Sequence, residues 1–241
     1  MTRVFSGLLT LCCVSMISVS FVYAGIKATF NYGFETGDLT DWVKTGNAFD
    51  FQPTWGDNPT ARNRGQPSKH EGDWWIGTYE KYQGPVKGKG QKAGGKQGDG
   101  PTGTLTSIKF PLRGNTMNFL IGGGTHPWKD DPKPCCVNLK IEGEVVRTST
   151  GKATETMSRQ EWNIAEFKGE KAQLEILDLH DGGWGHPNVD DFHQADASGK
   201  NIPWQDVMAS ATAIEAGGKD RLRPNKRVYG TLDWPSTFYN W

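Results

Sequence analysis

Two glycine-flanked segments, far apart in the chain, carry carboxylates that could bind a hard metal ion. The four acids are Glu35, Asp38, Asp190 and Asp191. Neighbouring carboxylates repel one another unless they share a cation, and carboxylates with turn carbonyls are ligands that Ca²⁺ prefers. If the first and last strands of the domain pair, Glu35 meets one of the two later acids. The sequence therefore predicts either a structural Ca²⁺ site or acids that only form turns and caps.

Asp190 and Asp191 do not have the arrangement of a glycosidase acid pair. Neighbours on a strand face opposite sides, so these two carboxylates cannot flank one glycosidic bond. The sequence also contains no Gly-x-Ser-x-Gly elbow, no phosphate-binding loop and no His-Glu-x-x-His helix. These observations favour a binding protein over an enzyme.

Aromatic and polar residues near glycine-rich loops suit sugar recognition. Three glycines precede His126 and Trp128, and they predict either a ligand beside bare backbone or a strand exit that needs positive φ. Trp74, Trp75 and Trp184 could cover the apolar face of a sugar or pack in the core, and strand alternation allows at most one of the first two in the core. The expected ligand-binding residues are Trp75, His126, Trp128, Arg147, Asp178, Trp184, His186 and Asn188.

Asp178 continues the apolar phase of Ala172, Leu174 and Ile176, so its side chain should point toward the core side of its sheet. A carboxylate there needs an ion pair or hydrogen bonds. Arg147, on the neighbouring hairpin, is the expected partner. The pair would be either a buried structural ion pair or a group that grips sugar hydroxyls.

Histidine and cysteine offer weaker signals. The five histidines are His70, His126, His180, His186 and His193. Their spacing matches no familiar zinc or copper motif, so we expect hydrogen-bonding loop residues rather than a metal site. Adjacent Cys135 and Cys136 would point to opposite faces of a strand, which disfavours a bond between them. A strained ring, a bridge to another chain and free thiols all remain open.

Residues 25–195 show short apolar runs separated by Gly, Pro, Asn and Asp, which predict an all-β domain. Apolar and polar residues alternate in several runs, as is typical of half-buried antiparallel strands. The expected strands are 74–79, 105–110, 117–121, 137–141, 144–148, 172–176 and 189–192. We predict a two-sheet antiparallel jelly-roll sandwich with a hairpin turn at Gly143.

The ends of the chain and one internal segment differ from this pattern. Residues 1–24 have a positive start, an apolar stretch and a small-residue cleavage site, which predict a secretory signal or, alternatively, an uncleaved anchor. Residues 196–241 predict a helix that begins near Pro203 and packs on the sandwich, followed by an extended tail. Residues 83–103 are rich in Gly and Lys and predict a flexible loop, either a solvated insertion or a contact for an acidic polymer.

The charge balance gives no general attraction to nucleic acid or to acidic membranes. The formal net charge is +0, and neither aromatics nor arginines interleave with the lysines of the flexible loop. We therefore expect no nucleic-acid partner and, after signal cleavage, no membrane contact.

Four segments in this order carry a family resemblance. They are Phe34–Trp42, Gly103–Ser107, Phe119–Gly124 and Gly183–Phe192. Together they resemble the β-sandwich module attached to family 32 glycoside hydrolases (levanases and related β-fructosidases), which is related to fructan-binding and jelly-roll carbohydrate-binding modules. The resemblance implies a non-catalytic sugar-binding jelly roll with a structural Ca²⁺ between the first and last strands, at Glu35 and at Asp190 or Asp191. Nothing in the sequence is like the Asn-Asp-Pro-Asn or Arg-Asp-Pro motifs of that family's catalytic propeller.

We therefore expect a secreted, non-catalytic carbohydrate-binding protein whose ligand is fructan or a related polysaccharide. Two alternatives stay open. One is a glycoside hydrolase of the β-fructosidase type, or its remnant. The other is an extracellular structural module that binds a protein.

Overall fold

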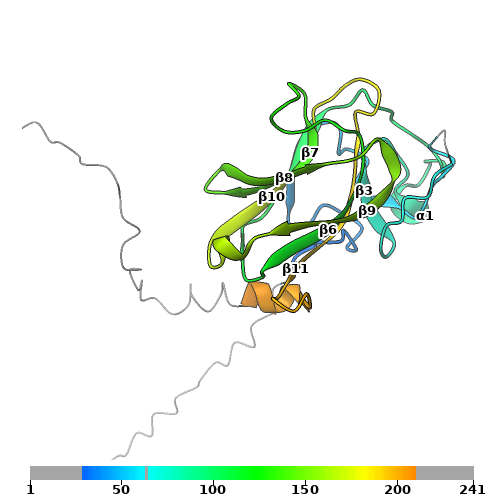
Figure 1. Ribbon diagram of the computed structural model, residues 1–241. Helices are drawn as coiled ribbons and strands as arrows, with labels where there is room; N and C mark the ends of the chain where they lie inside the picture. Colours follow the sequence, from blue (N-terminus) through cyan, green and yellow to red (C-terminus); the bar gives the residue numbers. More distant parts are fainter. Residues whose placement is uncertain (1–28, 63–64, 210–241) are drawn as a thin grey trace, which may run out of the picture.

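The computed structural model describes residues 29–62 and 65–209. Two antiparallel β-sheets pack face to face, and Figure 1 shows them as the two layers of the molecule. The prediction of an all-β, two-sheet jelly-roll sandwich is confirmed.

The first sheet has the strand order β1, β4, β10, β7, β8, and β5 pairs with β10. The bounds of these strands are β1 Trp42–Gly46, β4 Gly103–Ser107, β5 Phe110–Pro111, β7 Cys135–Ile141, β8 Glu144–Thr150 and β10 Lys171–Asp178. The second sheet has the order β2, β3, β11, β6, β9, and β12 pairs with β11. Its strands are β2 Thr54–Trp55, β3 Trp74–Gly77, β6 Thr116–Gly123, β9 Thr154–Asn163, β11 Pro187–Ala195 and β12 Asn201–Ile202. Two short helical elements, α1 and η1, span Gly84–Lys87 and Ala165–Phe167.

The core forms where the apolar faces of the two sheets meet. Leu139 pairs with Leu174 and Val137 with Ile176 across β7 and β10, and all four side chains are fully buried. Phe119 on β6 closes the core from the second sheet. Each such side chain stabilises the fold by about 1.5–3 kcal/mol, because burial removes its apolar surface from water.

The hairpin between β7 and β8 confirms the predicted turn. Glu142 and Gly143 form its two-residue loop, with φ of 51° and 90°. Two successive residues with positive φ match the right-handed twist of the flanking strands.

The opening acidic segment, residues 31–41, is not a strand. The first strand, β1, pairs with β4 and not with β11, so the expected pairing of the first and last strands is wrong. The segment reaches β11 by another route, since the N–H of Phe192 donates to the carbonyl of Tyr32 at 3.2 Å. The acids near residue 35 therefore still lie beside those at residue 190.

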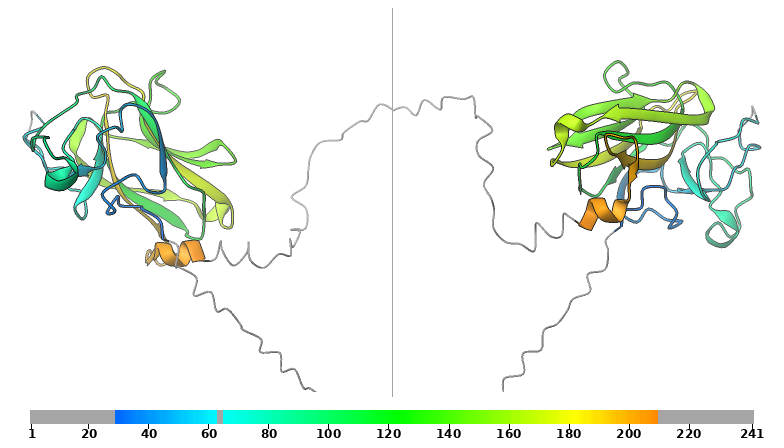
Figure 2. Two further views of the ribbon diagram at one scale, coloured as in Figure 1. Left: turned by 180° about the vertical axis from the view of Figure 1, so that it is seen from behind. Right: turned by 60° about the horizontal axis from the view of Figure 1, so that its bottom comes forward.

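The two ends of the described chain meet at one end of the sandwich. Residues 204–209 are helical, as predicted, and lie next to the blue start of the described chain in Figures 1 and 2. The ring centroids of Phe30 and Trp204 are 4.7 Å apart, and Trp204 Nε1 donates to the carbonyl of Phe192 at 2.7 Å. The signal at 1–24 and the tail beyond 209 lie outside the described residues. Within 29–62 and 65–209 we find no helix with the length and apolar character needed to cross a bilayer.

The Gly- and Lys-rich segment 83–103 lies against the sandwich. It contains α1, and Gln97 Nε2 donates to the carbonyl of Ala48 at 2.7 Å. The Lys81 N–H donates to the Gly95 carbonyl at 3.0 Å. These contacts place the segment, while its flexibility stays a prediction.

Cys135 and Cys136 are free thiols on opposite faces of β7. Both side chains are buried, and burial raises the pKa of both thiols, that of Cys136 to about 12.

Candidate functional site

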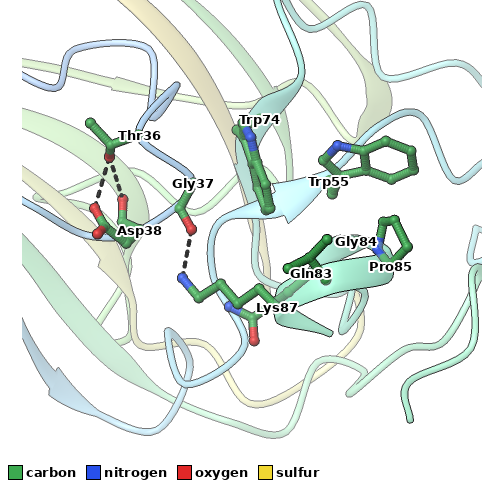
Figure 3. Close-up of a pocket in the computed structure, with 10 residues that line it drawn as sticks. Thr36, Gly37, Asp38, Trp55, Trp74, Gln83, Gly84, Pro85 and Lys87 are labelled. Carbon is green, nitrogen blue, oxygen red and sulfur yellow. Dashed lines mark hydrogen bonds between the residues drawn. The ribbon is translucent and has the colours of Figure 1, made fainter. Parts of the chain in front are cut away.

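A pocket of about 430 Å³ opens between α1 and the strands β2 and β3. Figure 3 shows the Trp74 and Trp55 side chains in its upper half, with Pro85 and Lys87 of α1 below them. Trp55 is 36% exposed and Val86 is 88% exposed, so large apolar surfaces here contact solvent. The lining residues are Thr36, Gly37, Asp38, Trp55, Trp74, Gln83, Gly84, Pro85, Val86 and Lys87.

Fixed polar groups stand beside these two indoles. The Asp38 carboxylate accepts hydrogen bonds from the Thr40 N–H at 2.9 Å and the Thr36 hydroxyl at 2.8 Å. These bonds, those from Thr40 first, lower the pKa of Asp38 and keep it ionised. Lys87 Nζ donates to the Gly37 carbonyl at 2.6 Å (Figure 3). A wall with apolar faces and a few fixed polar groups is a typical small-molecule site.

Gly37 is needed for this arrangement. Its φ is 70°, and a Cβ atom there would lie 3.0 Å from the indole of Trp74. Any side chain at this position would strain the turn and press on Trp74.

Trp75, expected to bind the ligand, is fully buried, so that prediction is wrong for the described structure. Trp74 shares the inward face of β3 with Ile76, while Trp75 points to the outer face. An irregular segment covers that outer face: His70 stacks on Trp75 at 5.9 Å, Arg62 lies over its ring, and its Nε1 donates to a backbone carbonyl. Trp74 therefore holds the position at the pocket.

Glu35 and Asp190 converge on a second, smaller pocket of about 180 Å³. A Cβ atom on Gly33 would lie 3.8 Å from Asp190 Oδ1 and 3.9 Å from Glu35 Cγ. The Glu35 carboxylate accepts the N–H groups of Asp73 and Trp74, each at 3.1 Å. The meeting of Glu35 with Asp190 thus follows the prediction.

Asp190 is fully buried and accepts the N–H groups of Glu71 and Asp191, both at 2.8 Å. Burial raises the pKa of Asp190 well above its usual range. In the described residues neither Asp190 nor Glu35 forms an ion pair with a basic side chain. A cation at this pocket would relieve the cost of two close carboxylates.

The other two predicted metal ligands have partners of their own. Asp38 is bonded within its own turn and lines the tryptophan pocket instead. Asp191 lines the smaller pocket, but its carboxylate pairs with Arg159 at 2.8 Å and His193 at 2.7 Å. It sits at a bulge in β11 with φ of 56°, so the simple alternation expected of Asp190 and Asp191 is interrupted there.

Asp178 and Arg147 do not meet, so the predicted pair is wrong. Asp178 lies opposite Cys135 at one end of the first sheet, whereas Arg147 lies opposite Leu139 and pairs with Glu166. Asp178 is buried as expected, and burial raises its pKa to about 8.

His186 and Asn188 are buried in a polar cluster rather than exposed to a ligand. His186 lies between Asp99 at 2.6 Å and Glu155 at 3.3 Å. Burial opposes its charge, but the hydrogen bonds to these two carboxylates outweigh that effect and raise the pKa of His186 to about 9. Asn188 donates to the Glu155 carbonyl at 2.9 Å.

Trp184 and Trp128 are half-buried, and Trp184 stacks on His186 with 5.7 Å between ring centroids. Their role in binding, and that of His126, stays a prediction. Sequence reasoning missed Trp55 and Lys87 and chose the wrong member of the Trp74–Trp75 pair. Ile76 provided the signal that could have been used. Residues two apart on a strand point to the same face, so Trp74 shares the inward face of β3 with the apolar Ile76.

Comparison with known proteins gives partial likenesses. No family model matches the chain. It is 36% identical over 127 residues to "Putative glycosyl hydrolase ecdE" of Aspergillus rugulosus, a match that covers 52% of this chain and 17% of that protein. The chain therefore spans under a fifth of the length of the curated relative that it matches.

Solved structures match the chain at low identity. The carbohydrate-binding module TmCBM61, in complex with β-1,4-galactotriose, is 18% identical, with 68% of this chain and 96% of that chain covered and a TM-score of 0.39. The K3 cleaved adhesin domain of Lys-gingipain from Porphyromonas gingivalis is 12% identical, with 67% and 95% covered and a TM-score of 0.37. These values are too low to transfer a function, and attachment to family 32 enzymes stays a prediction.

Proposed function

We propose that this protein is a secreted, non-catalytic carbohydrate-binding protein whose sugar sits in the pocket between Trp55 and Trp74. The observation that carries the proposal is the pairing of two accessible indoles with the fixed carboxylate of Asp38 and the ammonium of Lys87. Indole faces cover the apolar face of a sugar ring, while fixed charges hydrogen-bond its hydroxyls. Fructan or a related polysaccharide is the ligand class that the resemblance implies.

The lining of this pocket favours binding over cleavage. Glycosidases canonically place two carboxyl groups about 5–9.5 Å apart across the scissile bond. Among the described residues that line the pocket, Asp38 is the one carboxylate, and its low pKa makes it a poor general acid. The site can hold a sugar but lacks an acid pair to hydrolyse it.

A glycan array probed with the purified protein tests this function. We expect binding to a narrow group of glycans, with levan and inulin included among the probes. Absence of binding to every glycan at high protein concentration would remove the proposal and favour the alternative of a protein-interaction module. N-terminal sequencing of protein from the culture medium tests secretion, with cleavage expected after Ala24.

Hydrolase activity is the second candidate, because the segment of 36% identity belongs to a protein named as a glycosyl hydrolase. A reducing-end assay on any glycan bound in the array decides between the two. We expect no turnover. Turnover that disappears in an Asp38→Asn variant would replace the binding protein with an enzyme.

We also propose a structural Ca²⁺ held by the carboxylates of Glu35 and Asp190 together with nearby carbonyls. The donor set fits, since both side chains offer hard oxygens at one pocket and no described basic residue pairs with either. Ca²⁺ bound by these residues would join the opening segment to β11.

Chelation tests this ion. We expect excess chelator to lower the melting temperature, because an ion present at 100 times its Kd contributes about 2.7 kcal/mol to stability. The variants Glu35→Gln and Asp190→Asn should melt lower in Ca²⁺ and lose their response to chelator, whereas Asp38→Asn should keep it. A wild-type melting curve that chelator leaves unchanged would rule out structural calcium.

A further inference from the structure

We propose that His126, Asp131 and His180 form a binding site for a divalent transition-metal ion of the zinc and copper class. One ligand atom from each of these three side chains lies within 4.8 Å of the other two. His126 Nδ1 is 2.7 Å from Asp131 Oδ2, and the two imidazoles stack with 3.6 Å between centroids. The site is separate from the sugar and calcium pockets, because none of its ligands lines either one.

The two histidines come from loops that meet at one end of the first sheet. His126 lies in the loop after β6 and forms a bridge to Cys135 at the start of β7, and His180 follows β10, which pairs with β7. An ion held by both would connect these two loops. Asp131 supplies the third ligand from the loop after His126.

Backbone contacts hold the two loops in this geometry before any ion binds. The Cys135 N–H donates to the His126 carbonyl at 2.9 Å, and the Leu179 N–H donates to the Pro134 carbonyl at 3.0 Å. Lys133 and Asp181 add an ion pair at 2.7 Å between the loops. Ligands fixed in this way lose little conformational entropy on metal binding.

Glycine permits the close approach. A Cβ atom on Gly124 would lie 1.8 Å from the Trp184 carbonyl oxygen, and one on Gly185 would lie 2.0 Å from the His180 carbonyl oxygen. No side chain fits at either position without moving a loop. The glycines of the two loops, Gly124 and Gly185, therefore allow His126 and His180 to lie close together.

One donor in the cluster lacks a partner. His180 Nδ1 is buried and makes no hydrogen bond to the described residues. An unsatisfied buried nitrogen costs about 1–3 kcal/mol. A metal ion within reach of this lone pair, or a small rotation of the half-buried ring, would remove that cost.

The donor types select the class of ion. Imidazole nitrogen suits zinc, copper and nickel, whereas calcium and magnesium prefer oxygen ligands. The two rings lie close together, with 3.6 Å between their centroids, and imidazole binds metal through a ring nitrogen lone pair. Ligand atoms on a zinc ion lie about 3.3 Å apart. His126 Nδ1 and Asp131 Oδ2, which lie 2.7 Å apart, would therefore separate slightly, and ligand atoms farther apart would move closer.

Titration of the purified protein with Zn²⁺ by calorimetry tests the site, with Ca²⁺ present to saturate the Glu35–Asp190 pocket. We expect one Zn²⁺ per chain, with affinity that falls as the pH is lowered, because protons compete with the metal ion for its ligands. The His126→Ala and His180→Ala variants should bind at least about 100-fold more weakly, since even loss of an outer partner costs up to that factor.

His70→Gln is the matched control, because His70 Nδ1 already bonds the Ser68 hydroxyl at 2.6 Å. Circular dichroism checks that each variant folds, and His180→Gln replaces His180→Ala if that protein does not. Co²⁺ absorption gives a second readout, with a tetrahedral band expected in the wild type and in His70→Gln only. Wild-type protein without a Zn²⁺ site, or equal affinity in the folded His126 and His180 variants, would overturn the proposal.

Discussion

Replacing Trp74 or Trp55 by alanine should weaken glycan binding by about 30-fold or more. A tryptophan that anchors a ligand contributes at least about 2 kcal/mol, and 1.4 kcal/mol corresponds to a factor of ten in Kd. Trp55 gives the cleaner result, because it is 36% exposed and its removal disturbs little of the core. The double variant should lose all detectable binding, although the two effects need not add.

Isothermal titration with the tightest ligand from the array measures this effect. Trp74 packs partly against the core, so its alanine variant also loses stability, and Trp74→Phe separates the two effects. The matched control is Trp128→Ala, which removes a half-buried tryptophan outside the pocket. Unchanged affinity in folded Trp55→Ala and Trp74→Phe would place the sugar elsewhere, and a loss in Trp128→Ala would move it to the loop after β6.

The free energy of unfolding should fall as the pH rises from about 4 to about 9. Asp178 has its pKa raised to about 8 by burial, and His186 has its pKa raised to about 9 by Asp99 and Glu155, which outweigh burial. The folded state therefore holds both protons at a pH where the unfolded chain has released them, and stability drops with a slope set by this difference. The Asp178 contribution is lost between about pH 4 and 8, and that of His186 between about 6.5 and 9.

Chemical unfolding at a series of pH values, in buffer with Ca²⁺, measures this dependence. The total change should be at most on the order of 10 kcal/mol, since each pKa unit is worth about 1.36 kcal/mol and the two contributions have the same sign. Asp178→Asn should reduce the slope between pH 4 and 8, where Glu80, whose pKa burial also raises to about 8, still contributes. Asp196→Asn changes a half-buried aspartate whose pKa is lowered by hydrogen bonds from Ser198 and Lys200, and it should leave the slope above pH 5 unchanged. Stability that rises steadily from pH 5 to 8 would contradict the buried, protonated state of Asp178.

The alternating strands were predictable because a period of two in apolar residues indicates a strand with one buried face. Val137 and Leu139 alternate with the polar residues Asn138 and Lys140, and both apolar side chains lie in the core on β7. The turn at Gly143 was equally local, since positive φ at two residues leaves few choices of side chain. Where the interaction spans neighbouring residues, the sequence was sufficient.

The tryptophan pocket could not be predicted from strand alternation alone. Alternation shows that Trp74 and Trp75 face opposite ways, but the outward tryptophan is covered by a segment without regular structure. No periodicity marks such a segment, so the sequence could not reveal that the outer face is closed. As a result, Trp75, which was expected to bind the ligand, is buried, and Trp74 lines the pocket.

The polar cluster needed contacts across long stretches of chain. His186 meets Asp99 across 87 residues and Glu155 across 31, and neither partner is implied by local pattern. The bulge at Asp191 likewise depends on how β11 pairs with β6. By contrast, the proximity of Glu35 and Asp190 was predicted, although through a strand pairing that does not exist.

The contact between Phe30 and Trp204 has a practical consequence for protein engineering. Because the described chain enters and leaves the sandwich at one place, the whole unit could be spliced into a surface loop of another protein with little strain on the host. The inserted domain would be joined to its host at two adjacent positions, and its tryptophan pocket would stay open to solvent. With the sugar binding that we propose, an enzyme carrying this graft would be tethered to a polysaccharide surface without losing either of its own termini.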